Sequence, residues 1–201
     1  MLLTCLACLA CLVPAGCARQ PGPAMRPQHT SVDVDTPSLR ALKARAGVEP
    51  CRRGAASPAA HGLPDLTLPC LGGGPPVALS GLRGPLVVNL FAQWCGPCRT
   101  ELPFYQELHR RAKGTVQVLG VDYLDEQPAG ALEVARAAGV TYPLLADPSG
   151  RLRPELRVRG LPGVVLVDRS GAVVDVEFRV FRSYAELRQL VQHRLGVSLS
   201  A

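Results

Sequence analysis

Apolar runs of strand length alternate with amphipathic stretches through most of the chain. The segment GPLVVNLFA, residues 84–92, is apolar almost throughout, which is typical of a strand buried on both faces. The segment TVQVLGVDY, residues 115–123, has the same character, and the pattern between the two predicts a helix from about Cys95 to Lys113. A second helix is predicted over 127–139, because its proline suits a first helical turn and its last glycine suits a C-cap.

The C-terminal part of the sequence predicts a hairpin and a final helix. After a short strand over 141–147, the segment GVVLVDRSGAVVDVEFRV, residues 163–180, contains two strand-like runs around a turn at 169–171. Ser183 suits the N-cap of the last helix, with Glu186 three residues later as in a capping box. Strands that alternate with helices imply a parallel core sheet, and the terminal hairpin adds antiparallel strands.

Two short strands and a turn are predicted ahead of this core. The segments LPDLTLPCL and PVALSGL, residues 63–71 and 76–82, flank a turn of glycines and prolines. Residues 18–62 are rich in Pro, Ala, Gly and Arg, and apart from a short helical pattern over Ser38–Ala46 they are typical of a tether. The sequence thus predicts one compact domain over 63–197.

The segment 1–17, MLLTCLACLACLVPAGC, is uncharged and mostly apolar. It is too short to span a bilayer comfortably and is typical of the apolar region of a signal peptide. Its ending PAGC is similar to a lipobox, the signal for cleavage before a lipid-modified cysteine, which would be Cys17. A plain signal peptide and a retained anchor are the alternatives, and each export route leads to an oxidising compartment.

Composition narrows the classes of function. The 201 residues carry a formal charge of +6, and only 4% of them are aromatic. The positive charge comes almost entirely from arginines scattered among Ala, Gly and Pro, without a basic patch interleaved with aromatic residues. We therefore expect no nucleic-acid partner, and attraction to an anionic membrane surface is a simpler use of the charge.

The segment FAQWCGPCRTELP, residues 91–103, holds two cysteines three positions apart. Half of a metal site, a structural disulfide, or a disulfide that opens and closes would each fit this pair. A structural zinc site needs about four ligands, and the chain beyond the leader offers no second C-x-x-C and only dispersed histidines. A bridge over so few residues restrains little chain, so the redox interpretation is favoured, with no metal and no cofactor.

The two cysteines have different predicted roles. Cys95 opens the helix, where free N–H groups and the helix dipole favour a thiolate, and thiol pKa values in such motifs fall to about 7 or below. The thiolate is the attacking species in disulfide exchange. Cys98 lies one turn further in and suits the resolving role. Pro97, after Gly96, would stiffen the intervening turn, and Trp94 would cover one side of it.

The motif WCGPC after an apolar strand, with RGLPG at 159–163 before another strand, resembles the thioredoxin superfamily. Within it, CRTELP narrows the resemblance to the membrane-tethered TlpA/ResA-like thiol–disulfide oxidoreductases. The resemblance covers about residues 63–195. It implies an α/β thioredoxin fold, with a mixed central β-sheet flanked by helices, an N-terminal β-hairpin extension and an inserted helix. It also implies a cis proline opposite the active disulfide, at Pro162, and a helix-kinking proline at Pro103.

The resemblance identifies two further positions near the cysteines. Asn89 stands where thioredoxin carries a buried Asp, and an amide cannot act as a carboxylate base. Glu101 stands where ResA-like proteins carry a Glu on the active-site helix. One turn beyond Cys98, it could share a helix face with that thiol, and an apolar environment would raise its pKa so that it exchanges a proton. The alternative is an ordinary carboxylate in an early helix turn.

Cys51 and Cys70 lie outside the motif and the leader. In an exported chain they suit a second, structural disulfide. Such a bridge would close a loop of about 20 residues, would contribute about 3 kcal/mol, and would pin the Pro-rich segment to the domain. Two free thiols are the alternative.

Three functions remain open. The first is an extracytoplasmic thiol–disulfide oxidoreductase, membrane-anchored or secreted, that reduces disulfides of partner proteins, because the Gly-Pro dipeptide is that of reducing thioredoxins. By analogy, the resemblance implies apocytochrome c or metal-site proteins as substrates and a membrane thiol donor. The second is an AhpC/TSA-type peroxidase, although Ala92 stands where such enzymes carry a threonine. The third is a non-enzymatic metal or haem carrier, although the methionines, Met1 and Met25, lie outside the domain.

Overall fold

The computed structural model describes residues 32–112 and 114–200. In this part of the chain, a mixed sheet has the strand order β5-β4-β3-β6-β7. Its strands are β3 (Leu86–Phe91), β4 (Gln117–Tyr123), β5 (Leu144–Asp147), β6 (Gly163–Val167) and β7 (Val173–Glu177). β3, β4 and β5 pair in parallel, while β6 is antiparallel to β3 and β7 is antiparallel to β6. The predicted parallel core with an antiparallel terminal hairpin is confirmed.

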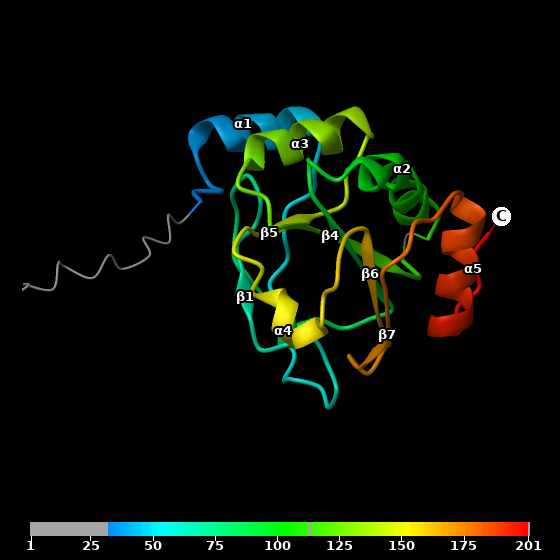
Figure 1. The fold of residues 1–201 in the computed structure, drawn as a ribbon. Helices are drawn as coiled ribbons and strands as arrows, with labels where there is room; N and C mark the ends of the chain where they lie inside the picture. The colour runs from blue at the N-terminus through cyan, green and yellow to red at the C-terminus, as the bar shows by residue number, and fades with distance from the viewer. Residues whose placement is uncertain (1–31, 113, 201) are drawn as a thin grey trace, which may run out of the picture. The chain divides into compact units, whose positions relative to one another are not determined.

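Two layers cover this sheet. One core cluster packs beneath the helices α1 (Pro37–Ala46), α2 (Gly96–Arg111), α3 (Pro128–Ala137) and α5 (Tyr184–Leu195). The other cluster packs beneath α4 (Leu152–Leu156) and a small antiparallel pair made of β1 (Thr67–Leu68) and β2 (Val77–Ala78), which leads into a 3-10 turn at Leu79–Gly81. The ribbon shows α1 and α3 side by side, with α5 on the opposite flank from β1 (Figure 1). The expected N-terminal hairpin extension is therefore present as β1 and β2.

The central strand β3 joins the two layers. All six of its residues are buried, and alternate side chains point to opposite faces of a strand. Accordingly, Val87 and Phe91 belong to the cluster beneath α2, and Val88 and Leu90 belong to the cluster on the other face. A strand buried on both faces has to be apolar throughout, which explains the uninterrupted run in the sequence.

The segment before residue 63 differs from the sequence-based expectation. A tether was expected over 18–62, but the compact unit begins at Val32. Thr36 caps α1 by accepting a hydrogen bond from the Leu39 N–H at 3.3 Å, and Leu39 and Leu42 are buried in the core beneath α1 and α3. Because these leucines recur at helical spacing, α1 has an apolar stripe to bury, and the Pro- and Arg-rich composition around it masks that stripe. The leader 1–17 lies outside the described residues.

Helix ends follow the predicted signals with two local differences. α2 ends at Arg111, two residues before the predicted end, and α5 begins at Tyr184 after the predicted N-cap. Ser183 Oγ accepts a hydrogen bond from the Glu186 N–H, as a capping box requires. The Glu186 carboxylate, however, accepts from the Arg182 N–H instead of the Ser183 N–H. The hydrogen bond from the Glu186 side chain is thus made one residue earlier than in a standard capping box.

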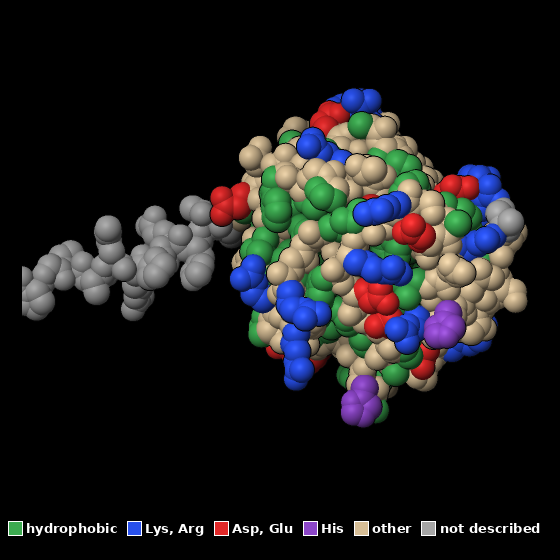
Figure 2. Space-filling view, turned by 45° about the vertical axis from the view of Figure 1, so that its right-hand side comes forward, with side chains coloured by type: hydrophobic (Ala, Val, Ile, Leu, Met, Phe, Trp, Pro, Cys, Tyr) green, Lys and Arg blue, Asp and Glu red, His purple; other side chains and the backbone are tan. Residues whose placement is uncertain are grey.

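Charged side chains of both signs lie close together on the surface. Figure 2 shows Lys and Arg side chains beside Asp and Glu side chains on one face. Two such pairs involve β7 and its neighbours: Arg179 Nε lies 2.6 Å from Glu177 Oε2, and Arg194 Nε lies 2.8 Å from Asp175 Oδ2. Each pair joins an exposed arginine to a half-buried carboxylate, and ion pairs near the surface contribute little to stability, about 0–1 kcal/mol each. Among the described helices, none is long and apolar enough to cross a bilayer.

Candidate active site

Cys95 and Cys98 form a disulfide at the start of α2. Their sulfurs are bonded and their Cα atoms lie 5.3 Å apart. Cys95 is the N-cap of the helix, and its Sγ accepts a hydrogen bond from the Cys98 N–H at 3.2 Å. The first N–H groups of a helix have no partner within the helix. Sulfur at this position therefore accepts from an N–H that has no partner within the helix, and it faces the positive end of the helix dipole. Both effects favour a thiolate when the bridge opens.

The residues around the bridge are more exposed than the sulfurs. Cys95 and Cys98 retain only 4% and 2% of their accessible surface, whereas Gly96 and Pro97 between them are exposed. The two cysteines are thus almost equally buried in the oxidised state, so exposure does not separate attacker from resolver. What distinguishes the sulfurs is the N-cap position of Cys95.

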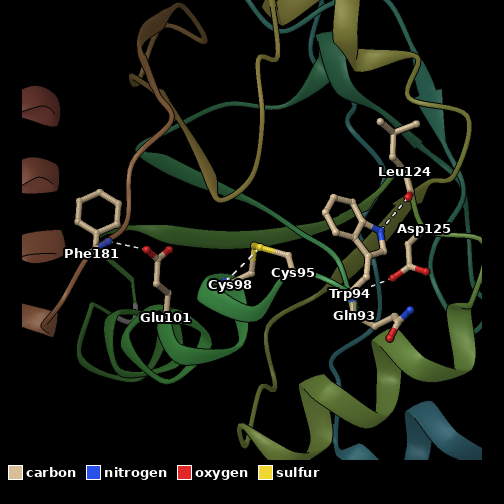
Figure 3. The surroundings of a disulfide bond; sticks show 8 residues. All are labelled: Gln93, Trp94, Cys95, Cys98, Glu101, Leu124, Asp125 and Phe181. Atoms are coloured by element: carbon tan, nitrogen blue, oxygen red, sulfur yellow. Dashed lines mark hydrogen bonds between the residues drawn. A yellow bond between two sulfur atoms is a disulfide. The ribbon is translucent and has the colours of Figure 1, made fainter.

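Trp94 is held beside the motif by a loop that the sequence did not single out. Its indole is 55% exposed, and its Nε1–H donates to the Leu124 carbonyl oxygen at 3.0 Å. Asp125, the next residue, accepts hydrogen bonds from the Gln93 N–H at 2.7 Å and the Gln127 N–H at 2.9 Å. The loop after β4 therefore fixes the backbone that enters the motif (Figure 3). Trp94 lies over this loop, as well as beside the turn it was predicted to cover.

Asp125 forms part of a buried carboxyl pair with Asp122. Asp122 stands at the end of β4, opposite Phe91 and Ala146, and the two aspartates are 1% and 3% exposed. Burial and the neighbouring Asp125 carboxyl raise the pKa of Asp122 well above its usual range. The Asp122 carboxyl therefore keeps its proton more readily than an ordinary carboxyl does. An aspartate within an otherwise apolar strand was the signal in the sequence for this pair.

Glu101 lies one turn beyond Cys98 and is only 1% exposed. Its Oε1 accepts a hydrogen bond from the Phe181 N–H at 2.5 Å, and its Oε2 has no partner among the described residues. The carboxyl and the disulfide rise from the same side of α2 (Figure 3). In the oxidised state shown here, the hydrogen bond of this carboxyl goes to Phe181 and not to a cysteine.

Burial changes the acidity of Glu101. Loss of hydration raises its pKa to about 7, against the opposing effects of the Phe181 N–H and the Arg179 guanidinium, while the Glu186 carboxylate adds to the increase. A carboxyl with a pKa near 7 can either hold or accept a proton at neutral pH. The free Oε2 lone pairs leave room for that proton.

Asn89 is buried in β3 at 2% exposed. Its Nδ2 donates to the Tyr142 hydroxyl oxygen at 3.2 Å, and burial raises the pKa of this tyrosine. The pair is therefore neutral. Asn89 anchors the core beneath α2 and provides no proton acceptor of the carboxylate kind.

Pro162 precedes β6 at the same end of the sheet as the motif. The antiparallel register pairs Gly163 with Leu90, so Pro162 lies opposite Phe91, at the end of β3 that leads into the cysteines. The Leu161–Pro162 peptide bond is cis, as is Gly84–Pro85. Pro162 is buried, and it has no N–H that could compete for the sulfurs.

The remaining candidate residues lie elsewhere. Cys51 and Cys70 form a second disulfide with Cα atoms 6.0 Å apart, next to β5 and away from the motif. Cys17 lies outside the described residues. Over 32–112 and 114–200, the structure contains no group of three or more His, Cys, Asp or Glu side chains placed to hold a metal ion.

Several curated bacterial proteins are similar to part of this chain. The thiol:disulfide interchange protein DsbE of Haemophilus influenzae is 34% identical over 44% of the chain and 48% of its own length. The thiol:disulfide interchange protein CycY of Rhizobium leguminosarum is 32% identical over 50% and 53%. The thiol–disulfide oxidoreductase ResA of Geobacillus kaustophilus is 31% identical over 49% and 57%. The chain thus matches about half the length of each of these relatives.

Solved structures match the fold over more of the chain. A putative thiol:disulfide interchange protein DsbE from Chlorobium tepidum is 27% identical with a TM-score of 0.59, covering 71% of this chain and 100% of that one. A putative protein disulfide isomerase from Bacteroides thetaiotaomicron is 30% identical with a TM-score of 0.57, covering 71% and 96%. These matches confirm the predicted thioredoxin fold.

The match to a protein family covers the sheet, the cysteine motif and the cis-proline loop together. The model of the AhpC/TSA family matches residues 59–176, more than half of the sequence. With its thioredoxin-type sheet and its likeness to thiol–disulfide oxidoreductases, the chain belongs to the AhpC/TSA family.

Proposed function

We propose that this protein is an extracytoplasmic thiol–disulfide oxidoreductase that reduces disulfides of partner proteins through Cys95 and Cys98. The observation that carries the proposal is the disulfide at the N-terminus of α2, with Cys95 as the N-cap. The named activities of the DsbE, CycY and ResA relatives support it. Gly96 and Pro97 between the cysteines favour the reducing direction, as in reducing thioredoxins.

The reaction begins with the reduced pair. The Cys95 thiolate attacks one sulfur of the substrate disulfide, and the other substrate sulfur leaves with the electron pair. Cys98 then loses its proton to Glu101 and attacks Cys95, which releases the first substrate sulfur as a thiolate. Two electrons have passed to the substrate, and the Cys95–Cys98 disulfide has formed. A membrane thiol donor would reduce this disulfide again.

Each supporting residue has a proposed part in these steps. Trp94 offers an exposed apolar face beside Cys95 on which a substrate can rest. Gly96 leaves space in front of the sulfur, since a side chain built there meets no atom within 4 Å. Pro162 lines the approach to the motif, and Asn89 holds the core behind it through Tyr142. In the oxidised enzyme, the Cys51–Cys70 bridge fastens the segment after α1 to the domain.

The substrates and location follow from the resemblance to TlpA/ResA-like proteins. Candidate partners are apocytochrome c and metal-site proteins with a disulfide. Cys17 is the proposed lipid-attachment site, which would tether the domain to the membrane, and release by a plain signal peptide is the alternative. Either way the protein works outside the cytoplasm, where a dedicated reductant is needed.

Turnover of insulin by the purified chain tests the proposal. With dithiothreitol as the electron donor, the wild-type protein should accelerate reduction of the insulin disulfides, and the Cys95→Ser variant should not. Peroxide consumption under the same conditions separates the peroxidase alternative. Peroxide turnover without insulin reduction would replace the proposal by that alternative, and a copper titration of the reduced pair tests the carrier alternative.

A further inference from the structure

A buried lysine lies against the second disulfide. Lys43 on α1 places its Nζ 2.9 Å from Cys70 Sγ and 2.8 Å from the Gly73 carbonyl oxygen. Lys43, Cys70 and its partner Cys51 are 8%, 2% and 4% exposed. Lys43 is one of only two lysines in an arginine-rich chain. A compact ammonium suits a single sulfur better than the planar guanidinium fork does.

The charge of Lys43 is poorly compensated while the bridge is closed. Burial lowers its pKa, against the opposing pull of the Asp35 carboxylate, and that carboxylate already lies 2.6 Å from Arg40 Nε. Among the described residues, no carboxylate forms an ion pair with Lys43. A disulfide sulfur is neutral and a weak acceptor, so the Lys43 ammonium is held by the neutral Gly73 carbonyl and a weak sulfur partner, without a countercharge in hydrogen-bond contact. A thiolate at Cys70 would supply the missing countercharge.

The two sulfurs of this bridge lie in opposite electrostatic settings. Cys51 Sγ lies 3.3 Å from the Leu144 carbonyl oxygen. That oxygen carries a partial negative charge, so it disfavours a thiolate and would accept a hydrogen bond from a thiol. The positive charge of Lys43 favours a thiolate at Cys70. After reduction, Cys51 is therefore the thiol and Cys70 is the thiolate.

We propose that the Cys51–Cys70 bridge is a second redox-active site, in which Lys43 holds Cys70 as a thiolate when the bridge opens. A dithiol reductant, with one thiolate and one thiol, attacks Cys51 Sγ; the S–S bond breaks and its electron pair stays on Cys70. The second thiol of the reductant then attacks the mixed disulfide, and its proton ends on Cys51. Two electrons pass to the bridge, and the reductant leaves as a disulfide.

The segment around the bridge has contacts that do not depend on it. The Glu49 N–H donates to the Thr141 carbonyl oxygen at 2.7 Å, and the Leu71 N–H donates to the Leu144 carbonyl oxygen at 2.9 Å. α1 also packs on α3. Opening the bridge thus leaves α1, Glu49 and Leu71 held by these contacts, so the two sulfurs stay near each other and the bridge can close again. None of these steps uses Cys95 or Cys98, and the inference stands apart from the proposed function.

Titration of Cys70 tests the electrostatic part of the inference. In the full chain carrying Cys51→Ser, the ¹³Cβ shift of Cys70 reports its ionisation whether or not reagents can reach it. We expect a pKa at least one unit below the ordinary value of about 8.5. Adding Lys43→Met should move it to 8.5 or above, because burial alone raises a thiol pKa. The control Arg45→Met, an exposed cation on the same helix, should leave it unchanged.

Equilibration with dithiothreitol tests the redox part. In the chain carrying Cys95→Ser and Cys98→Ser, the fraction of the Cys51–Cys70 bridge is measured by peptide mass mapping. At pH 8, adding Lys43→Met should lower the reduction constant at least about threefold, which corresponds to a potential about 15 mV more negative. Equal constants with and without Lys43 would overturn the inference. If the Lys43→Met chain does not fold, a Cys70 pKa at or above 8.5 in the Cys51→Ser chain alone overturns it.

Discussion

The backbone N–H of Phe181 donates to the buried carboxyl of Glu101 at 2.5 Å, joining the segment before α5 to the helix that carries the cysteines. One oxygen of that carboxyl is satisfied and the other is free. This arrangement fixes the position of the carboxyl without using up its capacity for a proton. The acidity of Glu101 is therefore set by burial, and its chemistry can be tested separately from the fold.

Replacing Glu101 by Gln should change how disulfide exchange depends on pH. Since the pKa of Glu101 is about 7, the wild-type rate should rise with pH through 7 as the carboxylate becomes able to take the Cys98 proton. Glu101→Gln should lose this step and be at least about tenfold slower at pH 7.5. Insulin reduction from pH 5 to 9 measures it, with Glu155→Gln on the exposed side of α4 as the control. An unchanged profile would return Glu101 to the role of an ordinary helix carboxylate.

The same substitution should alter how stability depends on pH. The folded protein keeps a proton on Glu101 up to about pH 7, whereas the unfolded chain loses it near 4.5. The native state thus binds more protons in this window, and the free energy of unfolding falls as pH rises from about 4.5 to 7. Glu101→Gln should flatten this fall. Urea unfolding of the oxidised protein at pH 4.5 and 7.5 gives the comparison, and an equal fall in both proteins would contradict the assigned acidity.

Removing the Asp125 carboxyl should destabilise the loop that supports the motif. Asp125→Ala leaves the partly buried N–H groups of Gln93 and Gln127 without their acceptor, which costs about 1 kcal/mol, the lower end of the range for an unsatisfied donor. Relief of the unfavourable contact with Asp122 offsets part of this loss. Urea unfolding should show the decrease, and amide hydrogen exchange at Gln93 should speed up. The exposed neighbour Glu126→Ala is the matched control, and identical exchange in the two variants would remove Asp125 from the support of the site.

Lipid attachment at Cys17, which lies outside the described residues, can be tested by substitution. Cys17→Ala should abolish incorporation of a labelled fatty acid and release the protein from membranes. Cys11→Ala, in the same apolar segment, should leave both unchanged. A wild-type protein that carries no lipid would leave plain secretion or a retained anchor as the export route.

The sequence predicted the elements that local patterns determine. β3 could be placed because a strand buried on both faces must be apolar throughout, and the start of α5 because Ser183 carries its own capping signal. The N-terminal position of Cys95 on α2 followed from the motif alone. The contacts between distant segments could not be read in this way. The Leu124 carbonyl accepts from the Trp94 indole, and the Gln93 N–H donates to Asp125. The partners of these backbone groups depend on how two loops meet.

The sequence did not predict that α1 packs against the domain, for a related reason. Lys43 resembles a surface lysine in sequence, and only the fold brings it to Cys70 and buries it there. Likewise, the apolar stripe of α1 is short and lies within Pro- and Arg-rich sequence, so composition favoured a tether. Burial against α3 outweighs that composition, because the leucines of α1 find an apolar surface only in the folded protein.

Trapping of a mixed disulfide tests the central claim most directly. Attack requires the Cys95 thiolate, and resolution requires the Cys98 thiol close to it. After reduction and mixing with a disulfide-bearing protein such as insulin, the Cys98→Ser variant should accumulate an adduct that peptide mass mapping places on Cys95. The Cys95→Ser variant should accumulate none. Equal adducts in the two variants, or an adduct of the Cys95→Ser variant on Cys98, would contradict the assigned attacker and resolver.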